Sequence, residues 1–187
     1  MAIGDRVRIT IQEFEQLAAQ PANQDKLLEL INGEIVEKMP TEEHGGIVLR
    51  LGGKLIEYVE ENNLGFASTE AGHRLPSDEY NERLPDISFI SGERQPVRNG
   101  VIPQMPDLAV EVKSPRNTYK SLREKADYYL QNGSRMVWLI FPEKELIEVY
   151  TLDADIDILQ IEDMLDGGEV IPGFKIPLTK IFRKLTR

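Results

Sequence analysis

The apolar run MVWLIF, from Met136 to Phe141, limits the possible folds more than any other feature of the sequence. Six residues are far too few to cross a bilayer, but they match a β-strand of ordinary length. Because no polar residue interrupts the run, we expect both faces of this strand to be buried. A strand covered on both faces belongs in a sheet with helices on either side, which indicates an α/β fold.

The sequence on either side of this run contains clear helix and strand patterns. Helices are predicted after Thr10, after Thr41 (ending near residues 62–63), from Pro115 to Asn132-Gly133, and near residues 178–185. Strands are predicted at residues 65–71, 84–90, 107–113, 146–151 and 156–161, and a β-hairpin around Asn32-Gly33. The middle of the chain is therefore predicted to run helix, strand, strand, strand, helix, strand.

Length and composition narrow the class of protein. The 187 residues contain no repeat or flexible linker, so we expect a single domain over residues 1–187. The absence of cysteine excludes a disulfide framework, a thiolate zinc site and a cysteine nucleophile. The first residues, MAIGDRVRIT, lack the apolar core of a signal peptide, and we expect a cytoplasmic location.

The net charge of −10 bears on possible partners. Proteins that bind nucleic acid over a wide surface usually carry a basic stripe. Here acidic residues are concentrated, notably in residues 153–169. The charge argues against extensive non-specific binding of DNA. It predicts a weak non-specific affinity for DNA whose dependence on salt is shallow, but it is compatible with a small metal-dependent site.

The predicted strand DLAVEVK carries apolar and charged residues in alternation. Leu108, Val110 and Val112 share one face of it, whereas Glu111 and Lys113 share the other. Such alternation is also typical of a strand with one solvated face, and this remains an alternative for the segment taken alone. The surrounding mixed pattern, which normally covers both faces of a sheet, favours burial of the charged side chains.

A second acid, Asp86, stands in the apolar segment LPDISFI, where burial of a lone carboxylate would be costly. Acids that interrupt two neighbouring apolar strands are explained by a shared cation. Mg²⁺ or Mn²⁺ prefers oxygen ligands and keeps several waters when one or two carboxylates hold it. We therefore expect Asp86 and Glu111 to bind such an ion, and Lys113 to point into the same cavity, where it positions or deprotonates an attacking water.

These residues resemble a known pattern. Pro85-Asp86 followed by the run 111–113, Glu-Val-Lys, resembles the PD-(D/E)XK signature of the restriction-endonuclease-like superfamily. Three longer stretches, LLELINGEIVEKMP, PDLAVEVKSP, and KADYYLQNG followed by MVWLIF, are similar to the bacterial family of Uma2-type endonucleases, formerly a domain of unknown function. The resemblance covers about residues 27–150. It implies an αβββαβ core with a mixed central sheet, an N-terminal β-hairpin and a C-terminal β extension.

The resemblance also implies roles for individual residues. Asp86 and Glu111 correspond to metal ligands, and Lys113 to the catalytic lysine. In many relatives an apolar residue replaces that lysine, and a lysine on the following helix is thought to substitute for it. Lys125 stands on this helix, with Tyr129 four residues later on the same face. The pair is similar to a Gln-xxx-Tyr motif of related nucleases, so both lysines remain candidates.

Two further residues are candidates for supporting the site without touching the ion. His44 is predicted in the first turn of the second long helix, and related sequences carry it. Glu34 directly follows the hairpin turn and could approach the site, although its position favours an exposed strand carboxylate. A lone histidine is more often an ordinary surface or core residue than a ligand, and this alternative applies to both His44 and His73.

The leading hypothesis is a metal-dependent endonuclease that hydrolyses phosphodiester bonds of nucleic acid, for which we expect DNA as substrate. The alternative is a catalytically silent nucleic-acid or protein-interaction domain that retains the nuclease fold, because a fold does not guarantee its chemistry. A small-molecule hydrolase finds no support in a Gly-rich phosphate loop or a nucleophile elbow. Nucleases of this fold often dimerise to cut both strands, so we also expect a homodimer.

Overall fold

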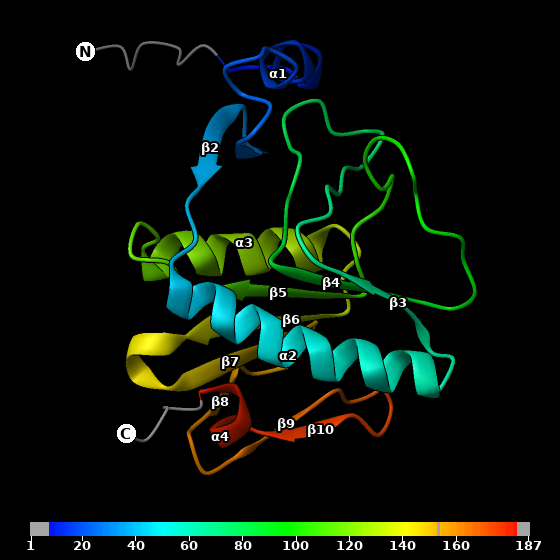
Figure 1. Ribbon diagram of the computed structural model, residues 1–187, viewed down its shortest axis with the longest axis vertical. Coiled ribbons are helices and arrows are strands. Elements are labelled where there is room, and N and C mark those ends of the chain that lie inside the picture. The colour runs from blue at the N-terminus through cyan, green and yellow to red at the C-terminus, as the bar shows by residue number, and fades with distance from the viewer. Residues whose placement is uncertain (1–7, 153, 183–187) are drawn as a thin grey trace.

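A six-stranded mixed sheet forms the centre of the protein (Figure 1). The structure is a computed structural model that describes residues 8–152 and 154–182. The strands follow the order β3 (Gly65–Ser68), β4 (Ile87–Ser91), β5 (Leu108–Val112), β6 (Met136–Phe141), β7 (Leu146–Thr151) and β8 (Asp157–Leu159). Only β5 and β6 are parallel, whereas the other neighbouring pairs in this sheet are antiparallel. The predicted mixed sheet is confirmed.

Two helices cover opposite faces of this sheet (Figure 1). Helix α2 (Glu42–Glu61) packs against the face that contains Leu108, Val110 and Val112. Helix α3 (Tyr119–Gln131) packs against the other face, where Ala109 lies in the core. The order α2, β3, β4, β5, α3, β6 is the predicted αβββαβ core. Strand β6 is buried at all six positions, as its apolar sequence predicts.

Local signals in the sequence set the helix boundaries. Thr10, Thr41 and Thr118 are the N-caps of α1 (Ile11–Ala18), α2 and α3, and each threonine side chain accepts a hydrogen bond from a backbone N–H of the first turn. The C-caps of α2 and α3 are Asn62 and Asn132, close to the predicted helix ends. Short-range chemistry therefore explains where these helices begin and end.

The predicted β-hairpin is formed by β1 (Leu27–Ile31) and β2 (Glu34–Lys38), which pair as a separate two-stranded sheet. Asn32 and Gly33 join them with φ values of 53° and 80°, as the favoured two-residue hairpin turn requires. Leu30 also exchanges backbone hydrogen bonds with Glu82, in the segment that leads to β4. The hairpin is thereby anchored beside the start of β4, and β2 leads directly into α2.

The C-terminal part departs most from the prediction. A second small sheet of β9 (Met164–Asp166) and β10 (Lys175–Pro177) has no counterpart in the predicted elements. It packs with α4 (Leu178–Ile181) on the side of the main sheet that α2 covers (Figure 1). The predicted last helix ran to residue 185, and residues 183–187 lie outside the described residues. A short 3₁₀-helix, η1 (Pro142–Lys144), joins β6 to β7.

Several strand ends differ from the prediction by a few residues. The strand predicted at residues 84–90 begins at Ile87, so that Asp86 lies immediately before it. The strand predicted at residues 65–71 ends at Ser68. In the part of the chain that the structure describes, no helix is long and apolar enough to span a membrane.

Two glycines give a direct test of this packing. A Cβ on Gly65, at the start of β3, would lie 2.1 Å from the backbone oxygen of Ile90, and its φ of +155° disfavours a side chain. A Cβ on Gly53, in the middle of α2, would meet no atom within 4 Å. We predict that Gly65→Ala lowers the free energy of unfolding by about 1–3 kcal/mol through overpacking. Gly53→Ala should raise it by about 0.5–1 kcal/mol, because alanine favours the helix.

Urea unfolding followed by circular dichroism measures both changes. Equal midpoints for Gly65→Ala and wild type would show that β3 does not pair with β4 in the described register.

Candidate active site

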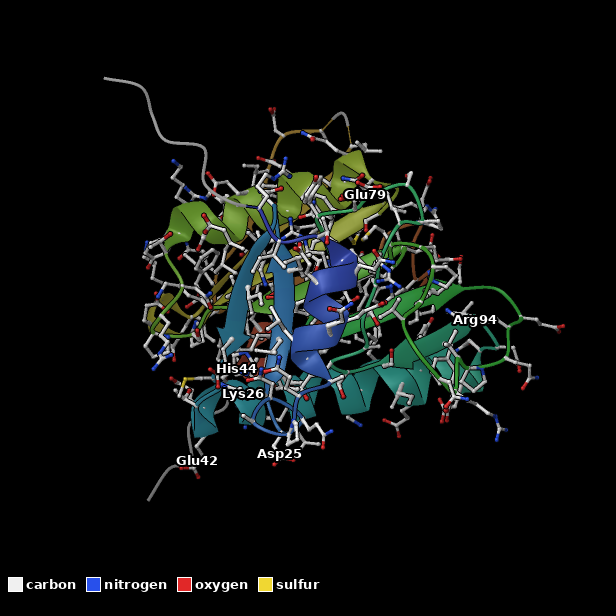
Figure 2. All side chains as sticks on the ribbon, turned by 90° about the horizontal axis from the view of Figure 1, so that it is seen from above. Asp25, Lys26, Glu42, His44, Glu79 and Arg94 are labelled. Atoms are coloured by element: carbon white, nitrogen blue, oxygen red, sulfur yellow. The ribbon has the colours of Figure 1, made fainter. Side chains whose placement is uncertain are left out.

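Three buried carboxylates from distant parts of the chain meet at one end of the sheet. Glu29 lies on β1, Asp86 immediately before β4 and Glu111 on β5, and they are 1%, 1% and 2% exposed, respectively. All three line a cavity of about 160 Å³, whose other lining residues include Lys38, His44 and Lys125. Figure 2 shows the hairpin leading to the start of α2, where His44 is labelled. The cavity is therefore enclosed by the hairpin, α2, α3 and the central sheet.

Asp86 is fixed by three donors. Its Oδ1 accepts a hydrogen bond from the ammonium of Lys38, at the end of β2. Its Oδ2 lies 3.0 Å from Nε2 of His44 and accepts a hydrogen bond of 2.6 Å from the backbone N–H of Val112. The last bond ties the carboxylate of Asp86 to the strand that carries Glu111. As a result, the two acids expected to share a cation are held at the same cavity.

Glu111 is bound from the opposite side, by helix α3. The ammonium of Lys125 lies 3.2 and 3.1 Å from its two carboxylate oxygens, and the hydroxyl of Tyr129 donates to Oε1 at 3.0 Å. Lys125 also donates to Oε2 of Glu29 at 2.7 Å. The spacing of four residues places Lys125 and Tyr129 on one face of α3, directed at the same acid.

The charges perturb one another strongly. Burial opposes ionisation of Asp86, but the hydrogen bond with His44 and the charge of Lys38 outweigh it and hold the pKa of Asp86 well below its ordinary value. Burial likewise opposes the charged form of Glu29, yet Lys125 and Lys38 lower its pKa. For Glu111 burial dominates over the attraction of Lys125 and Lys38, so its pKa is raised. Glu111 is thus the least compensated of the three acids.

The two lysines respond in the opposite direction. Burial disfavours their charged forms, but Glu111 together with Glu29 raises the pKa of Lys125 well above its ordinary value. The pKa of Lys38 is also raised, because Glu111 and Asp86 outweigh its burial. Both ammonium groups therefore remain protonated at neutral pH. The three carboxylates, Glu29, Asp86 and Glu111, thus outnumber the two ammonium groups by one.

The donor set fits a hard divalent cation. Carboxylate oxygens are the ligands that Mg²⁺ and Mn²⁺ prefer, and one or two of them suffice when water and phosphate complete the coordination. Among the described residues, no three Asp, Glu or His side chains are arranged as a ready metal cage. Asp86 and Glu111, in a cluster where carboxylates outnumber ammonium groups, match a site of the two-carboxylate kind.

The prediction that Lys113 points into the cavity of Asp86 and Glu111 is wrong. Its ammonium forms an ion pair of 3.0 Å with Glu143 on η1 and lies 5.3 Å from the centre of the Tyr119 ring. It is not among the residues that line the cavity. Lys113 follows the last residue of β5, and the turn after β6 offers it a nearby carboxylate. The lysine that the structure places beside Glu111 is Lys125.

Of the two predicted supporting residues, one lies at the cavity and the other does not. His44 contacts Asp86, as a supporting residue would, whereas Glu34 is exposed and does not line the cavity. Two residues of the cluster, Glu29 and Lys38, were not selected from the sequence. The available signal for Glu29 was its place inside the apolar strand LLELI, and Lys38 ends the facing strand.

Comparison with known proteins identifies the family and supports the fold. The family model Uma2, described as "Putative restriction endonuclease", matches residues 11–179. The chain belongs to the Uma2 family. A solved structure from Anabaena variabilis, titled as a putative nuclease belonging to DUF820, superposes on this Uma2 chain with a TM-score of 0.78 and 22% identity. The match covers 93% of this chain and 97% of that chain, and it supports the fold. No curated protein matches this sequence.

Lys125 and Lys113 make a matched pair for a stability test. Lys125→Met leaves Glu29 and Glu111 buried without their cation, so we predict a loss of about 3–5 kcal/mol in the free energy of unfolding at pH 7. Lys113→Met removes an ion pair whose acid is 43% exposed, and its effect should stay below about 1 kcal/mol.

The loss in Lys125→Met should also depend on pH. Without the ammonium, the folded-state pKa of Glu29 rises from its lowered value and that of Glu111 rises further. A raised pKa of an acid adds stability as the pH falls. The deficit relative to wild type should therefore shrink between pH 7 and pH 5. Denaturant titrations at both pH values measure it, and a deficit independent of pH would mean that packing rather than charge is lost.

Proposed function

We propose that this Uma2 protein is a metal-dependent endonuclease that hydrolyses phosphodiester bonds of nucleic acid, with DNA as the substrate. The observation that carries the proposal is the single cavity that holds Asp86, Glu111 and Lys125. Membership of a family described as restriction endonucleases supports it. Asp86 and Glu111 would hold Mg²⁺ or Mn²⁺, which supplies charge neutralisation at a phosphate and lowers the pKa of bound water.

The protein groups would act through fixed charge. Because the pKa of Lys125 is raised, its ammonium keeps its proton and serves as a hydrogen-bond donor to a phosphate oxygen rather than as a base. Glu29 accepts a hydrogen bond from this ammonium and positions it, and Tyr129 donates a hydrogen bond to Glu111 and positions that carboxylate. His44 and Val112 hold Asp86 in the orientation needed to bind an ion. We assign the role of catalytic lysine to Lys125 in place of Lys113.

A silent domain with a nuclease fold is the second candidate. One observation favours it, namely that Lys38 and Lys125 already satisfy the carboxylates that a cation would bind. The homodimer predicted from the sequence belongs to the enzyme hypothesis, since cutting both strands of a duplex calls for two sites. The cytoplasmic location stays a prediction from the sequence.

The decisive assay compares wild type with four variants on single- and double-stranded DNA and RNA in Mg²⁺ or Mn²⁺. Asp86→Asn and Glu111→Gln each replace a charged oxygen ligand, so both should lose ion binding and reduce cleavage by at least ~10²-fold. Lys125→Gln should bind the ion and reduce cleavage by about 10²–10³-fold, because a charged donor to the phosphate is lost. Lys113→Gln should cleave within a few-fold of wild type.

Calorimetric titration of Mn²⁺ and thermal unfolding of each variant provide the controls for ion binding and folding. If wild type binds the ion but cleaves no substrate, the silent-domain hypothesis is correct. A large loss in Lys113→Gln alone would reverse the assignment of the two lysines.

A further inference from the structure

A second hollow adjoins the candidate active site and contains an unusual arginine. This groove, of about 620 Å³, is lined by residues of the hairpin, of α3 and of the segment before β4. It shares Val36, Arg116, Asn117 and Lys125 with the smaller cavity of the carboxylates. A ligand bound at the carboxylates can therefore extend into the groove past Lys125.

Arg83 lines this groove and is only 2% exposed. Its Nη2 donates to Oδ1 of Asn81, and its guanidinium carbon lies 4.0 Å from the centre of the Tyr128 ring. The other two nitrogens, Nε and Nη1, are buried and have no hydrogen-bond partner in the described part of the chain. A guanidinium is always charged and carries five N–H donors, so this one is left largely unsatisfied.

No acid of the described chain forms an ion pair with Arg83. Asp78 is a candidate by position in the sequence, but its carboxylate accepts hydrogen bonds from Tyr80, Asn81 and Tyr128. The charge of Asp78 interacts with Arg83 at longer range and through Asn81, but it leaves Nε and Nη1 without an acceptor. Buried unsatisfied donors are rare in native proteins. The arrangement is explained if the partner is an anion that arrives with the ligand.

The surroundings of the groove favour a phosphate group. Arg83 and Arg116 contribute two positive charges, because Glu29 and Glu111 already compensate Lys125, and the exposed carboxylates of Glu124 and Asp127 lie at the rim. Lys120 lies 3.6 Å from Glu124 and offsets one of these. The guanidinium groups of Arg83 and Arg116 are therefore the charges of the groove that remain available to an incoming anion.

We propose that this groove is a phosphate subsite, in which Arg83 binds a backbone phosphate of the nucleic-acid strand adjacent to the scissile one. The inference rests on the proposed nuclease function and extends it from the reacting phosphate to its neighbour. The unpartnered Nη1 and Nε lie on different edges of the guanidinium, and each can donate a hydrogen bond to an oxygen of an incoming phosphate. Because both nitrogens are buried, the half-buried ring of Tyr128 that covers the guanidinium must shift when the phosphate enters.

Equilibrium binding of a fluorescent single-stranded DNA, measured by anisotropy in Ca²⁺ over a range of salt concentrations, tests the subsite. Arg83→Gln should weaken binding about tenfold and reduce the slope of log K against log salt by about 0.7, the value for one phosphate contact on a single strand. Arg116→Gln, at the exposed rim shared by both cavities, should act in the same direction. Arg135→Gln removes the same charge from an exposed position before β6, at the other end of the sheet, and should change neither quantity.

Thermal unfolding shows which variants are folded. If Arg83→Gln does not fold, the binding of DNA by Arg116→Gln decides whether the groove is a phosphate subsite. Binding and slope equal to wild type in the folded variant would overturn the subsite, as would equal losses in Arg135→Gln. The proposed function is judged separately, by cleavage in Mg²⁺. If wild type cleaves DNA while Arg83→Gln and Arg116→Gln bind DNA like wild type, the nuclease function is supported and the phosphate subsite is wrong. A wild type that binds DNA with the predicted variant losses but cleaves nothing would leave the subsite without the nuclease.

Discussion

The buried ammonium of Lys125 is the interaction on which the candidate site depends. It bonds to Glu29 on the hairpin and to Glu111 on the central sheet, and so connects three elements that lie far apart in the sequence. Each of these charges would be costly to bury alone, and together they are tolerable. The docked hairpin therefore brings Glu29 to the cavity and forms one of its walls.

A buried network of charged side chains contributes less to stability than an apolar core of the same volume. Well-packed apolar residues of similar volume often replace a buried ion-pair network at no loss of stability or with a gain. The Uma2 chain instead keeps more carboxylates than ammonium groups around Glu111, whose pKa burial raises. Strongly perturbed groups in a hollow are typical of functional sites, where stability is given up for chemistry. The cost argues for a site that a cation completes, and against a silent domain.

The sequence predicted what local chemistry decides and missed what long-range contacts decide. Threonine caps, the Asn32-Gly33 turn and the alternation along β5 act within a few residues, so the helices, the hairpin and the residues on each face of β5 could be predicted. The choice between Lys113 and Lys125 depends on which carboxylate each meets in space, Glu143 or Glu111, and no spacing rule contains this. Glu29 and Lys38 were missed for the same reason, since their partners lie many residues away. The strands β9 and β10 have three residues each, too few to show a period.

The positions of the positive charges show how this acidic chain could still bind nucleic acid. Many basic groups are already committed, such as Arg123 to Glu148 and Lys175 to Asp166. Lys38 and Lys125 are likewise paired with the buried carboxylates, whereas Arg83 and Arg116 line the groove, where low-dielectric walls strengthen their field. A strand of nucleic acid would thus be repelled by most of the surface and attracted along one short path, past Arg83 and Arg116. Such a charge distribution limits non-specific coating of DNA and confines binding to the few phosphates nearest the carboxylates.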